Sequence, residues 1–234
     1  LGYAIDRSKY FGKSIYNSGT EGDLFKVNNN IAFNSDQMHG IGLHVYGSYV
    51  DVTQNADINA NGDYGIGIRV DGVGNKVTIN SNVSANGEGG NGLLVAYGKD
   101  HNITLNTGKT IEATGTDGVA ARFDFGSNEL GDKFEYRGSY ILTRYTSKED
   151  IDEMIEDDPD NADTIIENHK IGWSPITEES LVDAINGDLV TDFNVAGTLK
   201  GEKAAIYISE NALVNKINIM NGASIQGDII SKWN

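Results

Sequence analysis

Short runs of alternating apolar and polar residues recur along the chain at nearly constant spacing. The four clearest runs each begin with a glycine and cover residues 40–46, 65–71, 92–98 and 118–124. Their first glycines lie 25, 27 and 26 residues apart. Because the side chains of a β-strand point alternately to its two faces, each run predicts a strand with one apolar face. In the second and third runs that face consists of Ile66, Ile68 and Val70, and of Leu93, Val95 and Tyr97.

Two more strand candidates follow in each repeat of about 26 residues. One series is 50–52, 77–79 and 103–105, and the other is 58–62, 83–87 and 111–115. A single repeat cannot bury an apolar face alone, whereas stacked repeats bury a continuous column. The pattern therefore predicts an all-β solenoid, a parallel β-helix, and the crossover rule makes it right-handed. A leucine-rich repeat lacks its signature here, and a propeller blade needs four strands in about 40 residues.

Glycine and asparagine separate the predicted strands. Solenoid corners often need a positive φ, which glycine adopts freely and asparagine tolerates better than most residues. We therefore expect both residue types to occupy left-handed corner positions.

An acidic window interrupts the repeats. The whole chain has a net charge of −16, and residues 147–192 alone carry 15 acidic and 2 basic side chains. The window also contains both prolines, Pro159 and Pro175. We therefore predict a small insertion at 147–192 between two parts of one solenoid.

The two flanking parts differ in regularity. Residues 1–146 form the first part, in which 1–39 look like degenerate coils. Strands are expected there at 24–27 and 31–33. The pattern resumes over 193–234.

Helical spacing marks the insertion. Ser147 and Asp150 resemble a capping box, and Ile151, Met154 and Ile155 follow on one helical face. Further short helices are predicted at 161–169 and 177–186. We expect these helices to form a side lobe.

Composition excludes several functions. The negative charge opposes nucleic-acid binding, because phosphates are neutralised by Lys and Arg. No stretch approaches the roughly 20 apolar residues of a membrane-spanning helix. The chain has no cysteine, and its four histidines lack metal-ligand spacing, so we expect no metal and no cofactor. The Gly-x-Ser-x-Gly nucleophile motif is also missing, and no residue is assigned a catalytic role.

Candidate binding residues fall in two outward columns of the aligned repeats. The first column contains His44, Arg69 and Arg122, with Ala96 between them, and the second contains Asp71 and Asp124. Some β-helix enzymes act on acidic polysaccharides with Asp and Arg on such a face. An Arg and an Asp two residues apart can equally pair in solvent, which contributes a few tenths of a kcal/mol. Both interpretations stay open.

Three segments resemble the β-helical passenger of bacterial type V autotransporters. They are GLLVAYGKDHNITL (92–105), GVAARFDFGSNELGDKFEYRGSYI (118–141) and FNVAGTLKGEKAAIYISENALVNKINIMNGASIQGDII (193–230). They look most like the region that follows the protease domain in subtilisin-like serine protease autotransporters. The resemblance covers 40–146 and 193–234. It implies a parent protein with a protease or adhesive head and an outer-membrane barrel, but no subtilisin catalytic motif occurs in this chain.

The sequence therefore predicts a structural role. We interpret the chain, which begins at Leu1, as a piece of a longer protein. The resemblance implies a rigid, monomeric stalk displayed on the bacterial surface and joined to its cognate outer-membrane barrel. The alternatives are an adhesin module that binds a host surface protein or glycan, and a glycan-cleaving β-helix enzyme.

Overall fold

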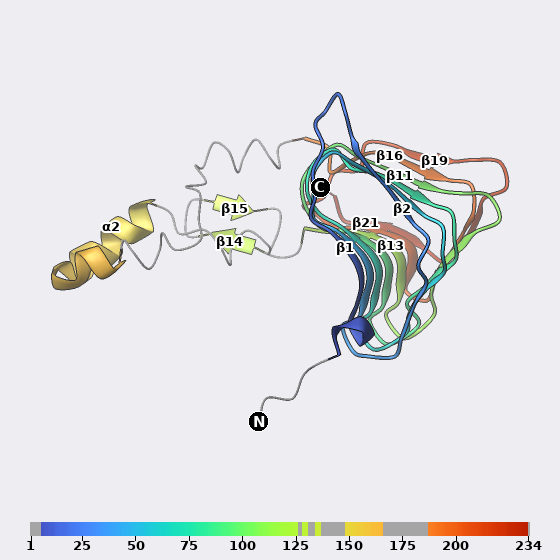
Figure 1. Ribbon diagram of the computed structural model, residues 1–234, viewed down its shortest axis with the longest axis horizontal. Coiled ribbons are helices and arrows are strands. Elements are labelled where there is room, and N and C mark those ends of the chain that lie inside the picture. Colours follow the sequence, from blue (N-terminus) through green and yellow to red (C-terminus); the bar gives the residue numbers. More distant parts are fainter. Residues whose placement is uncertain (1–5, 126–127, 131–133, 137–147, 166–186, 234) are drawn as a thin grey trace.

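Three parallel β-sheets build the protein. The computed structural model describes residues 6–125, 128–130, 134–136, 148–165 and 187–233 of the 234-residue chain. Viewed along the stack, successive coils lie one behind another with a common outline (Figure 1). The sheets contain seven, six and six strands. The predicted parallel β-helix with about 26 residues per coil is thereby confirmed.

Six coils each contribute one strand to each sheet, and a last strand, β21, adds to the first sheet alone. The first sheet contains β1 (Phe11–Ile15), β4 (Ile41–Val45), β7 (Ile66–Val70), β10 (Asn91–Val95), β13 (Val119–Phe123), β18 (Ala204–Ile208) and β21 (Ile229–Ser231). The second contains β2 (Phe25–Asn29), β5 (Val50–Gln54), β8 (Lys76–Ile79), β11 (His101–Leu105), β16 (Val190–Val195) and β19 (Ile217–Ile219). The third contains β3 (Phe33–Ser35), β6 (Ile58–Ala60), β9 (Val83–Ser84), β12 (Thr110–Ala113), β17 (Thr198–Gly201) and β20 (Ser224–Gln226).

Inward side chains form apolar columns that run the length of the stack. One column of the first sheet consists of Leu43, Ile68, Leu93, Ala121 and Ile206, all fully buried. Burial of one large aliphatic side chain stabilises a fold by roughly 1.5–3 kcal/mol. Because each coil covers the one before it, this stabilisation accumulates only when the coils stack.

The third run pairs two residues away from its predicted alignment. The sequence places Gly92 beside Gly65, but the structure pairs Asn91 with Ile66. A shift of two leaves the same strand face inward, so Leu93 is buried as predicted. Tyr97 instead lies beyond the end of β10, in the corner, where it is only partly buried.

Alternation also fails at the first residue of some strands in the first sheet. Ile66 is half-buried, and its neighbour Gly67 faces the third sheet, where an added Cβ would overlap Val83 Cγ1. Gly42 and Gly92 are enclosed by third-sheet side chains in the same way. In these three coils the two sheets therefore approach too closely for a side chain at this position, whereas the next two coils carry Ala120 and Ala205 there.

Glycine occupies left-handed positions as predicted, for example at Gly72 and Gly98, but asparagine does not. The described non-glycine residues with positive φ are His39, Tyr49, Tyr64, Asp100 and Asp117. None of these is asparagine, so the expected role of asparagine is wrong for the described corners. The rings of Tyr49 and Tyr64 lie where a Cβ on Gly74 or Gly89 of the next coil would be.

The asparagines form ladders between coils instead. Asn55 donates a hydrogen bond to Asn30 at 2.9 Å, and Asn80 donates to Asn55 at 3.2 Å. Asn106 extends the same ladder by donating to Asn80 at 3.2 Å. Stacked amides of this kind connect identical positions of successive strands, which explains why asparagine recurs with the period of the coil.

The first coil is more regular than the sequence indicates. Its strands β1, β2 and β3 pair in register with β4, β5 and β6. A 3₁₀ turn, η1 (Arg7–Lys9), precedes β1 and is capped by Asp6. The strand β1 lacks an alternating pattern because Lys13 takes the inward position that Leu43 occupies in the next coil.

The insertion leaves the solenoid at the corner between the first and second sheets. The strand β13 ends at Phe123 and β16 begins at Val190. The predicted limits of 147 and 192 are therefore wrong. The second limit was drawn at the last acidic residue of the window, Asp192, but this residue belongs to β16. Its carboxylate forms an ion pair with Lys216 Nζ at 3.4 Å.

The described parts of the insertion are a hairpin and helical segments. Strands β14 (Asn128–Leu130) and β15 (Phe134–Tyr136) pair antiparallel outside the three sheets. The helix α2 (Lys148–Asp157) confirms the first predicted helix, and η3 (Pro159–Asn161) follows it. Helical residues 162–165 begin the second, whereas Ser147 and the helix at 177–186 lie outside the described residues. No helix in the described part of the chain has both the length and the apolarity to cross a membrane.

Candidate functional site

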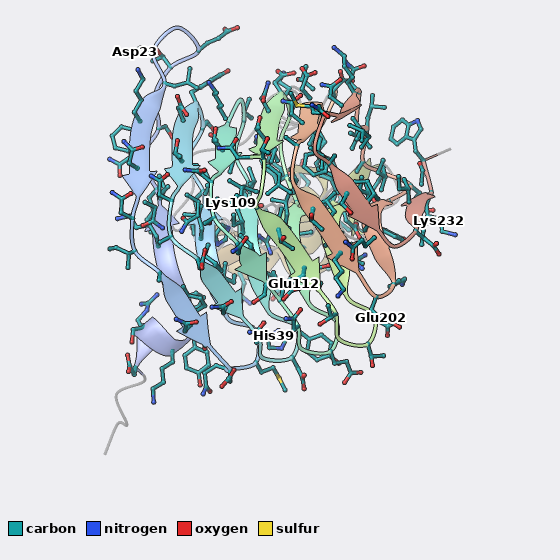
Figure 2. The ribbon with its side chains drawn as sticks, turned by 90° about the vertical axis from the view of Figure 1, so that its right-hand side faces the viewer. Asp23, His39, Lys109, Glu112, Glu202 and Lys232 are labelled. Atoms are coloured by element: carbon teal, nitrogen blue, oxygen red, sulfur yellow. The ribbon has the colours of Figure 1, made fainter. Side chains whose placement is uncertain are left out.

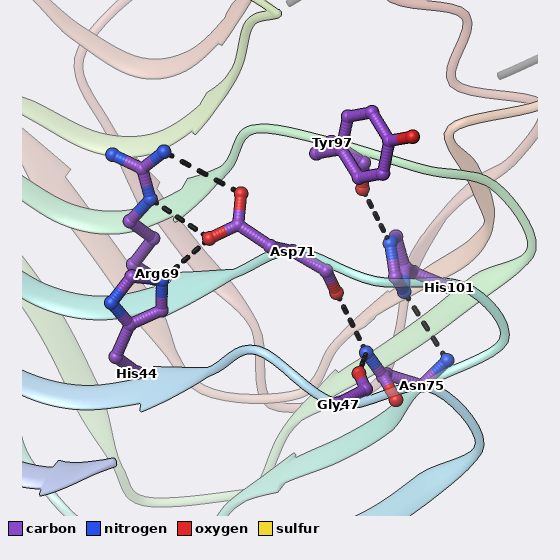
Figure 3. A network of polar contacts seen from close by, with 7 residues as sticks. All are labelled: His44, Gly47, Arg69, Asp71, Asn75, Tyr97 and His101. Atoms are coloured by element: carbon purple, nitrogen blue, oxygen red, sulfur yellow. Dashed lines mark hydrogen bonds and ion pairs between the residues drawn. The ribbon is translucent and has the colours of Figure 1, made fainter. Parts of the chain in front are cut away.

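The structure brings three of the five candidate residues together. His44, Arg69 and Asp71 meet where the first sheet turns toward the second (Figure 3). Arg122 and Asp124 form a separate pair further along the stack.

The column between these two groups is interrupted by Leu94. The register pairs Arg69 with Leu94 and Leu94 with Arg122. Ala96, the residue predicted to interrupt this column, lies two positions further on and follows the end of β10. The first sheet therefore carries no continuous ladder of basic side chains on its outer face within the described residues.

Asp71 is the centre of the first cluster. Its Oδ2 lies 2.5 Å from His44 Nε2 and 3.0 Å from Arg69 Nε. Only 1% of Asp71 and 4% of His44 is exposed. Buried carboxylates of this kind must be compensated by hydrogen bonds or opposite charges, and here two coils supply the partners.

The charge state of Asp71 follows from these contacts. Burial by itself raises the pKa of this carboxyl group. The hydrogen bond from His44 and the nearby charge of Arg69 act in the opposite direction and outweigh burial, so the pKa of Asp71 lies below its ordinary value. The group is therefore an ionised acceptor, unsuited to donating a proton as a general acid near neutral pH.

Aromatic rings cover His44. Its ring stacks on Tyr46 with centroids 3.4 Å apart, and Tyr46 stacks on Tyr16 at 4.7 Å. The second ring nitrogen, Nδ1, is buried and has no hydrogen-bond partner among the residues that the structure describes. His44 can therefore neither reach an external substrate nor relay a proton to a second group through this nitrogen.

A second polar network at the same corner was not identified from the sequence. The Asn75 side-chain amide donates to the carbonyl oxygens of Asp71 and Gly47, at 2.7 and 2.8 Å. The backbone N–H of Asn75 donates to His101 Nδ1 at 3.2 Å, and His101 Nε2 lies 2.8 Å from the Tyr97 carbonyl oxygen. These bonds fit a neutral His101 that carries its proton on Nε2. The sequence alone does not indicate this network, because it depends on how β11 pairs with β8. That pairing sets Asn102 beside Lys76 and so places His101 beside Asn75.

The second pair of candidates is more accessible. Arg122 Nη1 lies 3.4 Å from Asp124 Oδ2, and Arg122 Nε donates to Asn91 Oδ1 at 2.8 Å. The guanidinium also lies over the Tyr207 ring, 4.5 Å from its centroid. Arg122 thus contacts Asn91 of the preceding coil, Asp124 of its own coil and Tyr207 of the next coil. The ion pair and the cation–π contact hold these coils together.

These geometries support structural locks rather than reaction chemistry. The described residues contain no group of three or more His, Cys, Asp or Glu side chains placed to hold a metal ion. The glycosidase alternative needs two carboxyl groups that both reach a substrate, but Asp71 is enclosed and engaged by its own protein. The candidate site is therefore a buried cluster of His44, Arg69 and Asp71 that joins two neighbouring coils at a corner, which we call a lock between coils.

Burial of His101 predicts a pH-dependent stability. Desolvation lowers the pKa of His101, and the hydrogen bond to the Tyr97 carbonyl offsets this only in part. Below about pH 6.5 the unfolded chain takes up a proton that folded His101 refuses. The free energy of unfolding should therefore fall by up to about 1.4 kcal/mol per pH unit as the pH drops below that value. Urea unfolding at several pH values measures this slope.

The matched variant is His101→Gln, since its amide can accept from Asn75 and donate to Tyr97 without titrating. We expect a shallower slope between about pH 5 and 6.5 for this variant. Identical slopes for the two proteins would assign the acid sensitivity to other groups.

Comparisons with known proteins add no relative. A scan against models of known protein families finds no match, and searches of curated proteins and of solved structures give no significant match.

Proposed function

We propose that this chain is a rigid display segment, the stalk of a secreted passenger on a bacterial surface. The observation that supports this best is the unbroken stack of coils. The strand β16 pairs with β11 of the preceding coil through five residues, even though the whole insertion separates β16 from β13, the first strand of its own coil. The core column continues across this point, with Phe123 and Phe193 packed edge to face at 5.2 Å.

A continuous stack has the mechanical properties that a spacer needs. Every coil is tied to its neighbours by three parallel ladders and by asparagine side chains. The rod grows by roughly 4.8 Å for each coil added. Its length is therefore set by the number of coils and not by a flexible linker.

The surface location and the outer-membrane barrel belong to the proposal and rest on the sequence resemblance. The acidic charge suits a soluble rod. A protease, if the parent protein has one, would lie outside this segment, because the segment lacks the subtilisin motifs.

Surface display tests the proposal. The chain would be expressed between a secretion signal and an autotransporter barrel in a Gram-negative host. We expect antibody binding on intact cells and a protease-resistant β-helix. The matched control is Ile68→Asp, which places a charge at a fully buried core position and should make the displayed segment protease-sensitive. Failure of the wild-type segment to reach the surface, while the carrier alone does, would contradict the proposal.

Adhesion is a second candidate, and the insertion is the part that favours it. The helix α2 lies apart from the stack of coils (Figure 1). Its described acidic side chains are exposed, and Met154 is 41% exposed among them. A basic protein surface is the partner that this charge fits. Loss of host-cell binding on removal of the insertion, with the rod intact, would support adhesion.

A further inference from the structure

The two ends of the solenoid are chemically different. Figure 2 shows the stack from the side, with the first coil at one end and the last at the other. The strands β19, β20 and β21 are the last of the three sheets, and β1, β2 and β3 are the first. Each end therefore presents three edge strands whose outer backbone groups have no strand beside them within the described part of the chain.

The inward positions of the last strands form what we call the C-terminal face. It consists of Ile217, Ile219, Ile225 and Ile229, which continue the core positions of Phe193, Val195, Leu199 and Ile206. Ile219 is 53% exposed and Ile229 is 56% exposed, whereas the residues that they continue are fully buried. These four aliphatic core positions are thus partly or largely open to water at this end, whereas the neighbouring inward position of β21 is taken by the polar Ser231, which continues the column of Ile208.

The first coil keeps two of these four columns apolar, at Val27 and Phe33, and breaks the other two with polar side chains. Lys13 stands at the end of the column that runs through Leu43 to Ile229. Asn29 ends the column that runs through Gln54 and Val195 to Ile219. An inward-pointing charge on an edge strand is a known device against edge-to-edge association.

We propose that the C-terminal face is the docking surface for a further parallel β-solenoid coil, one that carries an aliphatic residue where this chain has Lys13. The face and its edge strands repeat the interface that already joins every pair of coils. The occupant is therefore defined by three strands in parallel register and an apolar inward row. In a stalk this occupant is the next coil of the rod, and the docking surface does not depend on the surface location proposed above.

A second copy of this chain does not meet these requirements. Head-to-tail stacking would place Lys13 of one copy over Ile229 of the other and bury an unpaired ammonium group, which is strongly unfavourable. Stacking of two C-terminal faces would oppose the strand directions and could not continue the parallel register. Lys13 therefore acts as a gatekeeper that keeps the wild-type chain monomeric.

Sedimentation velocity of three proteins tests both parts of the proposal. The wild-type chain should sediment as a monomer of 25.2 kDa. Lys13→Leu supplies the missing aliphatic residue and should form end-to-end oligomers whose mass rises in steps of one chain with concentration. Lys26→Leu removes the same charge from an exposed outward position of β2, and this control should stay monomeric.

A double variant identifies the face that receives the new coil. Lys13→Leu combined with Ile229→Lys should return to the monomer, because the charge now stands at the other end of the same column. A monomeric Lys13→Leu protein with an unchanged melting temperature would overturn the proposal. Oligomers of the wild-type chain, or oligomers that survive Ile229→Lys, would overturn it as well. All of these outcomes are read in solution and are independent of surface display.

Discussion

A chain in which Phe125 is joined directly to Gly187 is expected to fold into the same β-helix as the intact protein. The deletion removes residues 126–186. The register provides the reason: Val95 lies beside Phe123 and His101 lies beside Val190. Counting outward from these pairs places Phe125 beside Tyr97 and Gly187 beside Gly98.

The shortened corner would have the same length as its neighbour. The corner between β10 and β11 spans residues 96–100, and the new one would contain Asp124, Phe125, Gly187, Asp188 and Leu189. Gly98 has a φ of +91° and Gly187 has a φ of +127°. Both corners therefore have a glycine with positive φ at the same position. Closing the long excursion costs about 2 kcal/mol more than closing a five-residue corner. The variant should therefore melt at the same or a higher temperature.

Deletion of residues 147–192 should have the opposite effect. It removes Leu189 and the first three residues of β16, which include Val190, and both Leu189 and Val190 are fully buried. Loss of two large aliphatic core residues costs roughly 2–5 kcal/mol each. We expect the melting temperature to fall by about 10–20 °C. Thermal unfolding followed by circular dichroism compares the two variants, and equal melting temperatures would show that the limits drawn from the register are wrong.

The sequence identifies the coil better than it identifies the register. Alternation predicts which face of a strand is buried, because the period of side-chain direction is two residues. For the same reason it cannot distinguish Gly90 from Gly92 as the partner of Gly65, and the observed pairing of Asn91 with Ile66 depends on contacts between coils.

Corners are the least predictable part of the fold. Asparagine was expected at positive φ on local grounds, but its amides are used in ladders that exist only after stacking. Tyr49 and Tyr64 adopt positive φ although local preference disfavours it for bulky residues. Their rings lie against glycines of the next coil, a compensation that no single repeat reveals.

The candidate site was predicted in part. Sequence spacing placed Arg69 and Asp71 on the outer face of one strand run, and the pair exists. Burial of Asp71 could not be predicted, because alternation assigns it to the solvent side. The corner turns its carboxylate toward His44 of the preceding coil, and this contact joins residues 27 positions apart.

Replacement of Asp71 by alanine should destabilise the protein far more than replacement of Asp124. Both aspartates follow an arginine by two residues in the same two columns, which makes them a matched pair. Asp71→Ala leaves His44 Nε2 buried without its partner and removes the ion pair with Arg69. Breaking a buried charge pair in this way costs roughly 3–5 kcal/mol.

Asp124 is the less buried of the two. About a quarter of its side chain is exposed, at 24%, against 2% for Asp71. Exposed ion pairs contribute about 0–1 kcal/mol, so Asp124→Ala should change stability by about that amount. Urea unfolding of both variants at neutral pH measures the difference. Equal losses would show that Asp71 is not a lock between coils, and a stable Asp71→Ala protein would restore this aspartate as a residue kept for an external ligand.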